Sequence, residues 1–488
     1  MQFSVATFVS RILGFIRDAS VAFLVGAGRF ADVFNVAFRI PNLLRDLLAE
    51  NVMQSAFVPT YVKATERDET PKHFLDVVFT IFLMASLFIV ILGIVFSKQV
   101  VLITAYGFRS IPEKFKMTVE VTRITFPYLT LVSLASIFQA ILNARKEFFQ
   151  PALSTAYLNL GVIFVVVLAY FFVPRGMYPQ VLGFSVLFGG LVQLLYLIQR
   201  LKVHNVVPQF TIRLRHPYLK DFGKLLVPVF LSVGFSKITP FVNTLIASFL
   251  REGAVSYLTY AYRLMQLPVG LFAVALQTVS ISTFAELDAK HIDLRETLWK
   301  AVFYSIFLTL PSSIFIILYS GEIVKLLFER GAFTPFDTIL TAQALIMYTP
   351  HVVAIGVSKI FLNYFFAKGE TKFPNFSVVL GTVANLCVAI FLSRTLDFPA
   401  LALAVSTGTI IQMIFLMIVI RNRAPVTKEY ASKIFMVILN TFFATLPCLF
   451  IKVKGDILRL VIGFFMFTAV FISLSILTGA FPEFKLKR

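Results

Sequence analysis

The chain has 488 residues, of which 58% are hydrophobic and 14% are charged, and its mean hydropathy is +0.86. A soluble domain has about 25% charged residues, and a globule of this size has too small an interior to hide so much apolar surface. The composition therefore excludes a soluble enzyme, a disordered chain and a disulfide scaffold. It indicates a polytopic membrane protein.

About 14 apolar segments follow one another along the chain, each near the ~20 residues that span a bilayer. We expect helices, because lipid leaves no water to satisfy an open backbone, and the long unbroken apolar runs exclude a β-barrel. The fold class predicted is therefore an all-α polytopic membrane protein. The spans expected are 2–26, 31–62, 74–97, 119–142, 151–173, 179–199, 222–250, 254–285, 297–319, 337–366, 374–393, 398–420, 431–451 and 456–479.

The net charge is +19, from 44 Lys and Arg against 25 Asp and Glu. With the N-terminus inside, the inner links hold about 20 Lys and Arg and the outer links about 12. Because cytoplasmic loops are enriched in these residues, both termini are expected in the cytoplasm. No basic domain stands outside the apolar segments, so no nucleic-acid partner is expected.

The two halves of the chain share an internal repeat. The sequence of 10–15 resembles that of 236–241, and 37–39 resembles 261–263, an offset of about 224–226 residues. Since six spans separate the copies, the repeat predicts two parallel six-helix lobes with a central cavity. Chance similarity among apolar segments is the alternative. The domains expected are 1–216, 217–425 and a pair of extra helices in 426–488.

Charged residues inside the spans are the main functional signal, because an Arg at a helix centre costs about 2.5–3.5 kcal/mol. Cations outnumber acids in these spans, so a wet cavity that attracts an anion such as phosphate is expected. Interhelical ion pairs or snorkelling ends are the alternative. The residues concerned are Arg11, Arg17, Asp18, Asp32, Arg39, Arg45, Asp46, Glu50, Lys237 and Arg263.

Helical spacing separates these charges further. Asp32, Arg39, Asp46 and Glu50 fall on one stripe, whereas Arg45 points about 120° away from it. We therefore expect Arg39 to pair with Asp32 or Asp46, and Arg45 to need a ligand or another helix.

Motifs of other chemistry are missing from the sequence. It has no Walker loop, HExxH, CxxC or DxDxDG motif, and its five histidines are scattered. Neither catalysis nor a metal site is expected.

Five segments of the chain carry recognisable motifs: SRILGFIRD (10–18), GAGRFADVFNVAFRIPNLLRDLLAENVMQSAFVP (26–59), ITFPYLTLVSLASIFQAILNARKEFFQPA (124–152), GAVSYLTYAYRLMQLPVG (253–270) and FERGAFTPFD (328–337). These segments strongly resemble the MurJ/MviN family of lipid II flippases, which belongs to the multidrug/oligosaccharidyl-lipid/polysaccharide exporter superfamily. The resemblance implies a transporter that flips lipid II, an undecaprenyl-diphosphate-linked disaccharide peptide, across the bacterial cytoplasmic membrane by alternating access. It also implies that the two extra helices form a groove for the polyprenyl tail.

The resemblance also implies roles for individual residues. The essential cavity arginines correspond to Arg11, Arg17, Arg45 and Arg263, which would hold the diphosphate. Asp32 is the acid of the GAG…AD motif, Ser10 and Glu50 occupy matching motif positions, and these three residues are also expected in the substrate-binding site. The partners expected are lipid II and membrane lipids, and the protein is expected to be a monomer.

The chain departs from the family pattern in two ways. Tyr262 stands where many relatives have Asp before the second-lobe arginine. Where some relatives bind sodium with carboxylates, this chain has mostly uncharged residues, which argues against a sodium site and leaves coupling to membrane potential as the alternative. Those residues are Asn243, Thr244, Asn375 and Asn385, with Asp397 at the edge of its span. No cofactor is expected.

Three other functions remain open. A flippase for another polyprenyl-diphosphate glycan would need the same cationic cavity, and only the motifs argue against it. A cation-coupled multidrug exporter should have acidic pockets, which the arginine excess disfavours. A non-transporting scaffold of cell-wall assembly would leave the costly intramembrane arginines without a purpose.

Overall fold

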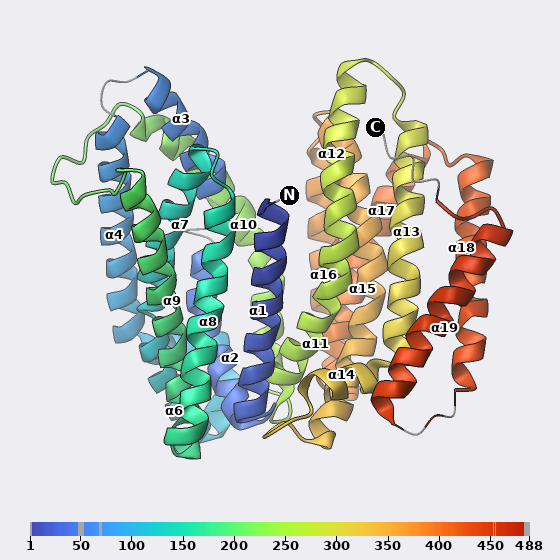
Figure 1. Ribbon diagram of the computed structural model, residues 1–488, viewed down its shortest axis with the longest axis horizontal. Helices are drawn as coiled ribbons and strands as arrows, with labels where there is room; N and C mark the ends of the chain where they lie inside the picture. The colour runs from blue at the N-terminus through green and yellow to red at the C-terminus, as the bar shows by residue number, and fades with distance from the viewer. Residues whose placement is uncertain (1, 47–52, 68–70, 452, 454, 483–488) are drawn as a thin grey trace. The chain divides into compact units, whose positions relative to one another are not determined.

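The computed structural model describes residues 2–46, 53–67, 71–451, 453 and 455–482, and all regular secondary structure within them is helical (Figure 1). This confirms the all-α fold class. The chain divides into two compact units, Met1–Ser256 with Arg330–Phe333 and Tyr257–Glu329 with Thr334–Arg488. The functional boundaries expected at 216 and 425 stay predictions.

Unit 1 is a bundle of long helices joined by short ones (Figure 1). Its elements are α1 Gln2–Val25, α2 Arg29–Arg45, the π-helical η2 Met53–Phe57, α3 Val58–Arg67, α4 Pro71–Val95, α5 Ser97–Thr104, η3 Tyr106–Ser110, α6 Pro112–Thr125, α7 Tyr128–Ala144, α8 Phe149–Phe172, η4 Arg175–Met177, α9 Tyr178–Val203 and α10 Leu219–Ala247.

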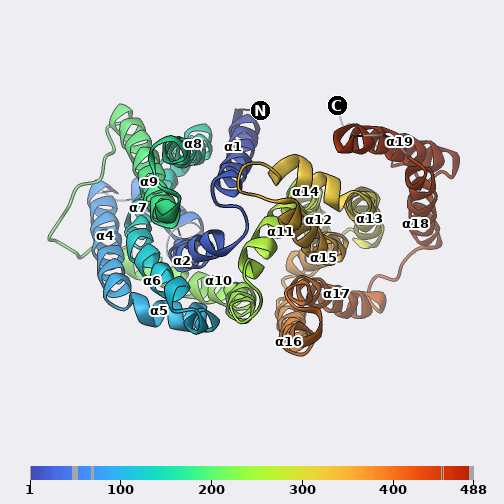
Figure 2. The same cartoon turned by 90° about the horizontal axis from the view of Figure 1, so that it is seen from below.

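Unit 2 contains the remaining helices, except that the first residues of α11 still belong to unit 1. Its C-terminal pair, α18 and α19, lies beside α13, outside the group formed by the other helices (Figure 2). The elements are α11 Ala254–Pro268, the π-helical η5 Val269–Ala273, α12 Val274–Ala289, α13 Arg295–Leu318, α14 Ser320–Phe328, α15 Pro335–Ala367, α16 Lys372–Leu396, α17 Pro399–Arg421, α18 Lys428–Leu449 and α19 Asp456–Leu477.

Within the described residues, 11 helical segments are long and apolar enough to cross a membrane. The sequence predicted about 14 spans. The three that are not among the 11 correspond to α1, to α2 with α3, and to α10. The number 14 therefore stays a prediction.

Close packing of two glycines recurs in both units. A Cβ on Gly161 of α8 would lie 2.7 Å from the Cα of Gly189 on α9. In unit 2, a Cβ on Gly381 of α16 would lie 2.8 Å from the carbonyl oxygen of Gly408 on α17. Small residues let membrane helices approach closely, and these glycines hold a helix pair at backbone contact in each unit.

Alanine at Gly161 is expected to destabilise unit 1 by about 1–3 kcal/mol, because α8 and α9 would have to separate to admit the methyl group. Thermal unfolding of the purified protein in detergent measures this loss. Gly176→Ala is the matched control, since nothing lies within 4 Å of the added Cβ. Equal stability of the two variants would contradict the close-contact explanation.

Candidate functional site

The first cationic group of unit 1 fixes α1 against α8. Arg17 donates from Nε and Nη2 to Asp18 Oδ1, at 3.0 and 2.7 Å, and from Nη1 to Asn159 Oδ1 at 3.0 Å. The Asn159 amide in turn donates to the Ser10 carbonyl at 3.2 Å, and the Ser10 hydroxyl bonds to that of Thr155. Arg17 is thus held in one orientation, and Ser10 contacts the neighbouring helix.

The second group joins α2 to α10. Arg45 donates from Nη2 and Nε to Asp46 Oδ1 at 2.9 and 3.2 Å, and Lys237 of α10 donates to Asp46 Oδ2 at 2.6 Å. One carboxylate therefore serves two cations. The group keeps a formal charge of about +1 on partly exposed side chains.

The expectation that Arg45 has no carboxylate of its own was wrong. Helical spacing compares the directions of the Cβ atoms, and adjacent residues differ by about 100°. The long arginine stem nevertheless lets the guanidinium swing back to Asp46. Lys237, whose expected span contains no acidic residue, also bonds to this carboxylate.

Asp32 forms a buried polar centre in unit 1. Its carboxylate accepts from Lys114 Nζ at 2.7 Å, from the backbone N–H groups of Gly253 and Ser256 at 2.8 and 3.0 Å, and from the Ser256 hydroxyl at 2.8 Å. The residue is 1% exposed and Lys114 is 2% exposed. Asp32 thus fixes the segment that leads into α11 against α2 and α6.

Arg39 does not pair with Asp32, contrary to one of the expectations, because Asp32 faces Lys114 and the start of α11. Arg39 instead donates from Nη2 to the Pro240 carbonyl of α10 at 2.8 Å. Through this contact a second cation of α2 reaches α10, the helix that carries Lys237.

The charges of this region do not cancel. Apart from the buried Asp32–Lys114 pair and the charges at the N-terminal ends of α2 and α10, α1, the α2 segment and α10 carry five cationic side chains against two carboxylates, and Arg11 among the cations is exposed. The residues are Arg11, Arg17, Arg39, Arg45 and Lys237 with Asp18 and Asp46. Such a surplus of positive charge favours binding of an anion.

Arg263, the arginine predicted for the second lobe, lies on α11 in unit 2, where it is exposed. The preceding Tyr262 accepts a hydrogen bond from Gln266 at 2.6 Å and packs edge-on against Tyr348 of α15, with ring centroids 5.7 Å apart. Glu50 lies outside the residues that the structure describes.

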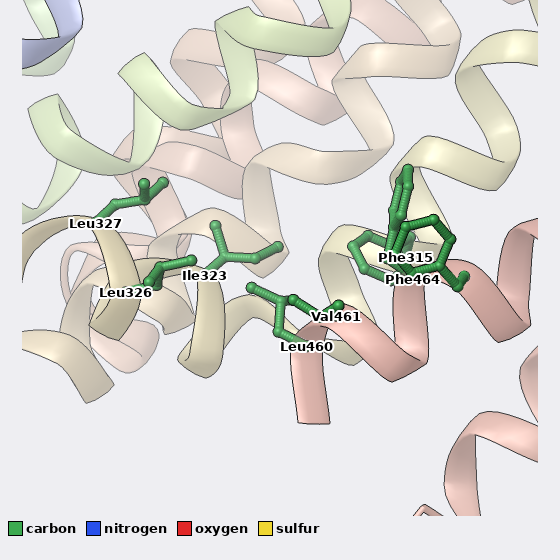
Figure 3. Close-up of a pocket in the computed structure, with 8 residues that line it drawn as sticks. Phe315, Ile323, Leu326, Leu327, Leu460, Val461 and Phe464 are labelled. Atoms are coloured by element: carbon green, nitrogen blue, oxygen red, sulfur yellow. The ribbon is translucent and has the colours of Figure 1, made fainter. Parts of the chain in front are cut away.

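An apolar pocket of about 330 Å³ opens in unit 2 between α13, α14 and α19. Figure 3 shows side chains from the three helices around it. Its lining is entirely apolar: Phe315, Ile323, Leu326, Leu327, Leu460, Val461, Phe464 and Phe465.

Ion pairs between α14 and α19 join the two helices near this pocket. Lys325 bonds to Asp456 at 2.6 Å, and Arg459 bonds to Glu322 at 2.9 Å. The hydrogen bond to the Asp456 carboxylate raises the pKa of Lys325.

Comparison with known proteins identifies the family. The sequence profile of the family described as lipid II flippase MurJ matches residues 21–474, which is nearly the whole chain. The chain belongs to the MurJ family. This confirms the resemblance found in its motifs, and it makes the protein a membrane transporter and not an enzyme.

MurJ relatives from distant bacteria align with most of the chain. A probable lipid II flippase MurJ of Buchnera aphidicola (from Acyrthosiphon pisum) is 32% identical over 89% of this chain and 85% of its own length. One from Thermotoga maritima is 32% identical over 96% and 94%. The lipid II flippase MurJ of Burkholderia cenocepacia is 32% identical over 86% and 82%.

Solved structures give the same result for the fold. A lipid II flippase MurJ in an inward closed conformation has a TM-score of 0.84 and 28% identity, and the match covers 97% of this chain and 98% of that one. An inward-facing multidrug resistance transporter of the MATE family has a TM-score of 0.68 at 16% identity, over 86% and 98%. The second likeness shows a shared fold alone.

The sequence missed two residues of this region. Lys114 falls in a segment that was interpreted as an outer link, yet it is the buried counter-ion of Asp32. Asn159 is a single polar residue in an apolar span, and the sequence does not indicate a role for it, yet it hydrogen-bonds to both Arg17 and the Ser10 carbonyl. Only the packing of helices far apart in the sequence reveals either role.

Proposed function

We propose that this chain flips lipid II from the inner to the outer leaflet of the bacterial cytoplasmic membrane by alternating access. The observation that carries the proposal is the surplus of cations on α1, α2 and α10 of unit 1. The diphosphate is the part of lipid II that such a surplus attracts, since guanidinium groups match phosphate oxygens with forked donors.

In this proposal Arg11, Arg17, Arg45 and Arg263 bind the diphosphate. Asp18 and Asp46 keep Arg17 and Arg45 oriented before the ligand arrives, so less side-chain entropy is lost on binding. Because Asp46 is shared with Lys237, a phosphate that replaces it at Arg45 leaves the carboxylate paired.

Alternating access needs elements with two arrangements, and a ligand can shift the balance between them only by binding one arrangement more tightly than the other. Pro41 interrupts the hydrogen bonding of α2, and Pro268 precedes the π-helical η5 between α11 and α12. Such interruptions are where helices bend. The Asp32 centre, which holds the start of α11, is the contact that we propose opens in the outward state.

The polyprenyl tail is proposed to stay in lipid and to run along α18 and α19, with the pocket of Figure 3 as part of its path. An apolar lining exposed to the bilayer suits a hydrocarbon chain and no polar ligand.

Filling this pocket with Val461→Trp is expected to slow transport of long-chain lipid II several-fold, because an indole would occupy the space of the tail. Transport of a short-chain analogue with the same head group should be unchanged. Leu458→Trp, on an exposed position of α19 outside the lining, is the matched control. A similar loss for both chain lengths would contradict a role in tail binding.

Reconstituted vesicles test the proposed function. Wild-type protein should move fluorescent lipid II between leaflets faster than empty vesicles do. A polyprenyl-diphosphate glycan of another structure and a cationic drug test the alternative functions. Movement of the other glycan at the same rate would favour a broader flippase, drug transport without lipid II movement would favour an exporter, and no movement at all would favour a scaffold.

The orientation with both termini in the cytoplasm is likewise our proposal, supported by the excess of Lys and Arg in the inner links. Labelling of single cysteines placed in the loop at Arg175 and in the link at Arg423 tests it, since only the first should react with an impermeant reagent from outside.

A further inference from the structure

A polar cluster joins α12 to α15 in unit 2, away from the arginines discussed above. Lys359 Nζ donates to the Gln277 side-chain oxygen at 2.8 Å. Asn363, one turn further along α15, donates to the Gln277 carbonyl at 2.7 Å and to the Ser280 hydroxyl at 2.8 Å. Asn363 and Ser280 are 1% and 4% exposed, so the base of the cluster is rigid and Lys359 lies half-buried above it.

Lys359 is a cation inside a membrane-spanning helix. It lies 24 residues after Pro335 and eight before Ala367, the ends of α15, and its ammonium group points to α12 and not along the helix to its end. Within the described part of the chain, no carboxylate lies within ion-pair distance of it. Such a charge is costly, and two of the three N–H donors of an ammonium group remain for a ligand.

The position of Lys359 along unit 2 decides which part of a ligand it can reach. The path α11–η5–α12 runs parallel to α15, because Tyr262 contacts Tyr348, and Gln277, which lies later on that path, contacts Lys359, which lies later on α15. At 1.5 Å per residue, Lys359 lies roughly 15–20 Å from the level of Arg263. A diphosphate is far too short to touch both residues.

A peptide has the required length. Five extended residues cover about 17 Å, and a peptide ends in a carboxylate that an ammonium group can bind. We propose that Lys359, positioned by Gln277 and supported by Asn363, is a subsite for a carboxylate of the peptide of lipid II. This inference rests on the proposed function and assigns a second anion site to it, separate from the arginines that bind the diphosphate.

Binding to two lipids tests the subsite. The full-length protein in nanodiscs is titrated with lipid II and with lipid II whose peptide carboxylates are converted to amides. Lys359→Met should weaken binding of lipid II about tenfold, the size expected for one charge-assisted hydrogen bond. Its affinity for the amidated lipid should equal that of the wild type, and Lys359→Arg should retain most of the discrimination. Lys300→Met, at an exposed lysine of α13, is the matched control.

Each outcome separates the two proposals. Equal weakening for both lipids, or no weakening for either, overturns the carboxylate subsite while the flippase function stands. Wild-type protein that binds neither lipid contradicts the proposed function itself. Lys359→Gln gives the same comparison if the methionine variant does not fold. Gln277→Met leaves the charge but removes its support, so it should reduce discrimination less than Lys359→Met does.

Discussion

Arg45→Ala is expected to abolish growth of cells depleted of their own lipid II flippase while leaving the protein inserted in the membrane. The substitution removes a forked donor that Asp46 holds in position, and the adjacent carboxylate then faces Lys237 alone. Loss of one buried charge-assisted phosphate contact costs about 2–5 kcal/mol, a factor of roughly 30 to several thousand in affinity. Complementation and membrane content, measured together, check this result.

The controls distinguish ligand binding from structural pairing. Arg175→Ala removes an exposed arginine from η4 and should grow normally. Arg45→Lys keeps the charge but lacks the fork, so it should grow poorly. If Arg45 served only to neutralise Asp46, removal of both side chains in Arg45→Ala/Asp46→Ala would restore growth. Restored growth of that double variant would contradict a role of Arg45 in diphosphate binding.

The sequence predicts the helices and the cationic character well, because both depend on composition and spacing along one helix. It cannot predict which charges meet when the partners come from distant helices. Lys237 and Asp46 are 191 residues apart, and Lys114 and Asp32 are 82 apart. The prediction for Arg45 was wrong for a different reason, because helical spacing ignores the reach of a long side chain.

Lys359 shows a further limit of the sequence. It stands in a long apolar run and has no acidic residue nearby, so spacing alone cannot tell a snorkelling lysine from one that faces a neighbouring helix. Its contact with Gln277 decides between these alternatives. The glycine pairs show the same limit. Nothing in the sequence around Gly161 or Gly408 indicates that glycine is required, and the requirement becomes visible only where two helix backbones touch.

Asp32→Asn is expected to destabilise unit 1 by about 3–5 kcal/mol and to stop transport. The carboxylate accepts four hydrogen bonds, three of them from the segment that enters α11. An amide in its place points an NH₂ group at these donors and leaves Lys114 as a buried cation without a counter-ion. Thermal unfolding in detergent and lipid II movement in vesicles measure the two losses.

Removing the second charge separates stability from function. Lys114→Met in the Asp32→Asn background should recover much of the lost stability, because an uncharged pair replaces a single buried ion. Transport should stay impaired, because the Asn amide still points an NH₂ group at the hydrogen-bond donors at the start of α11. Asp221→Asn, at an acid of α10 that is 58% exposed, is the control and should change neither property. Full recovery of transport in the double variant would show that Asp32 contributes only its charge, and the proposed opening of this contact would then be wrong.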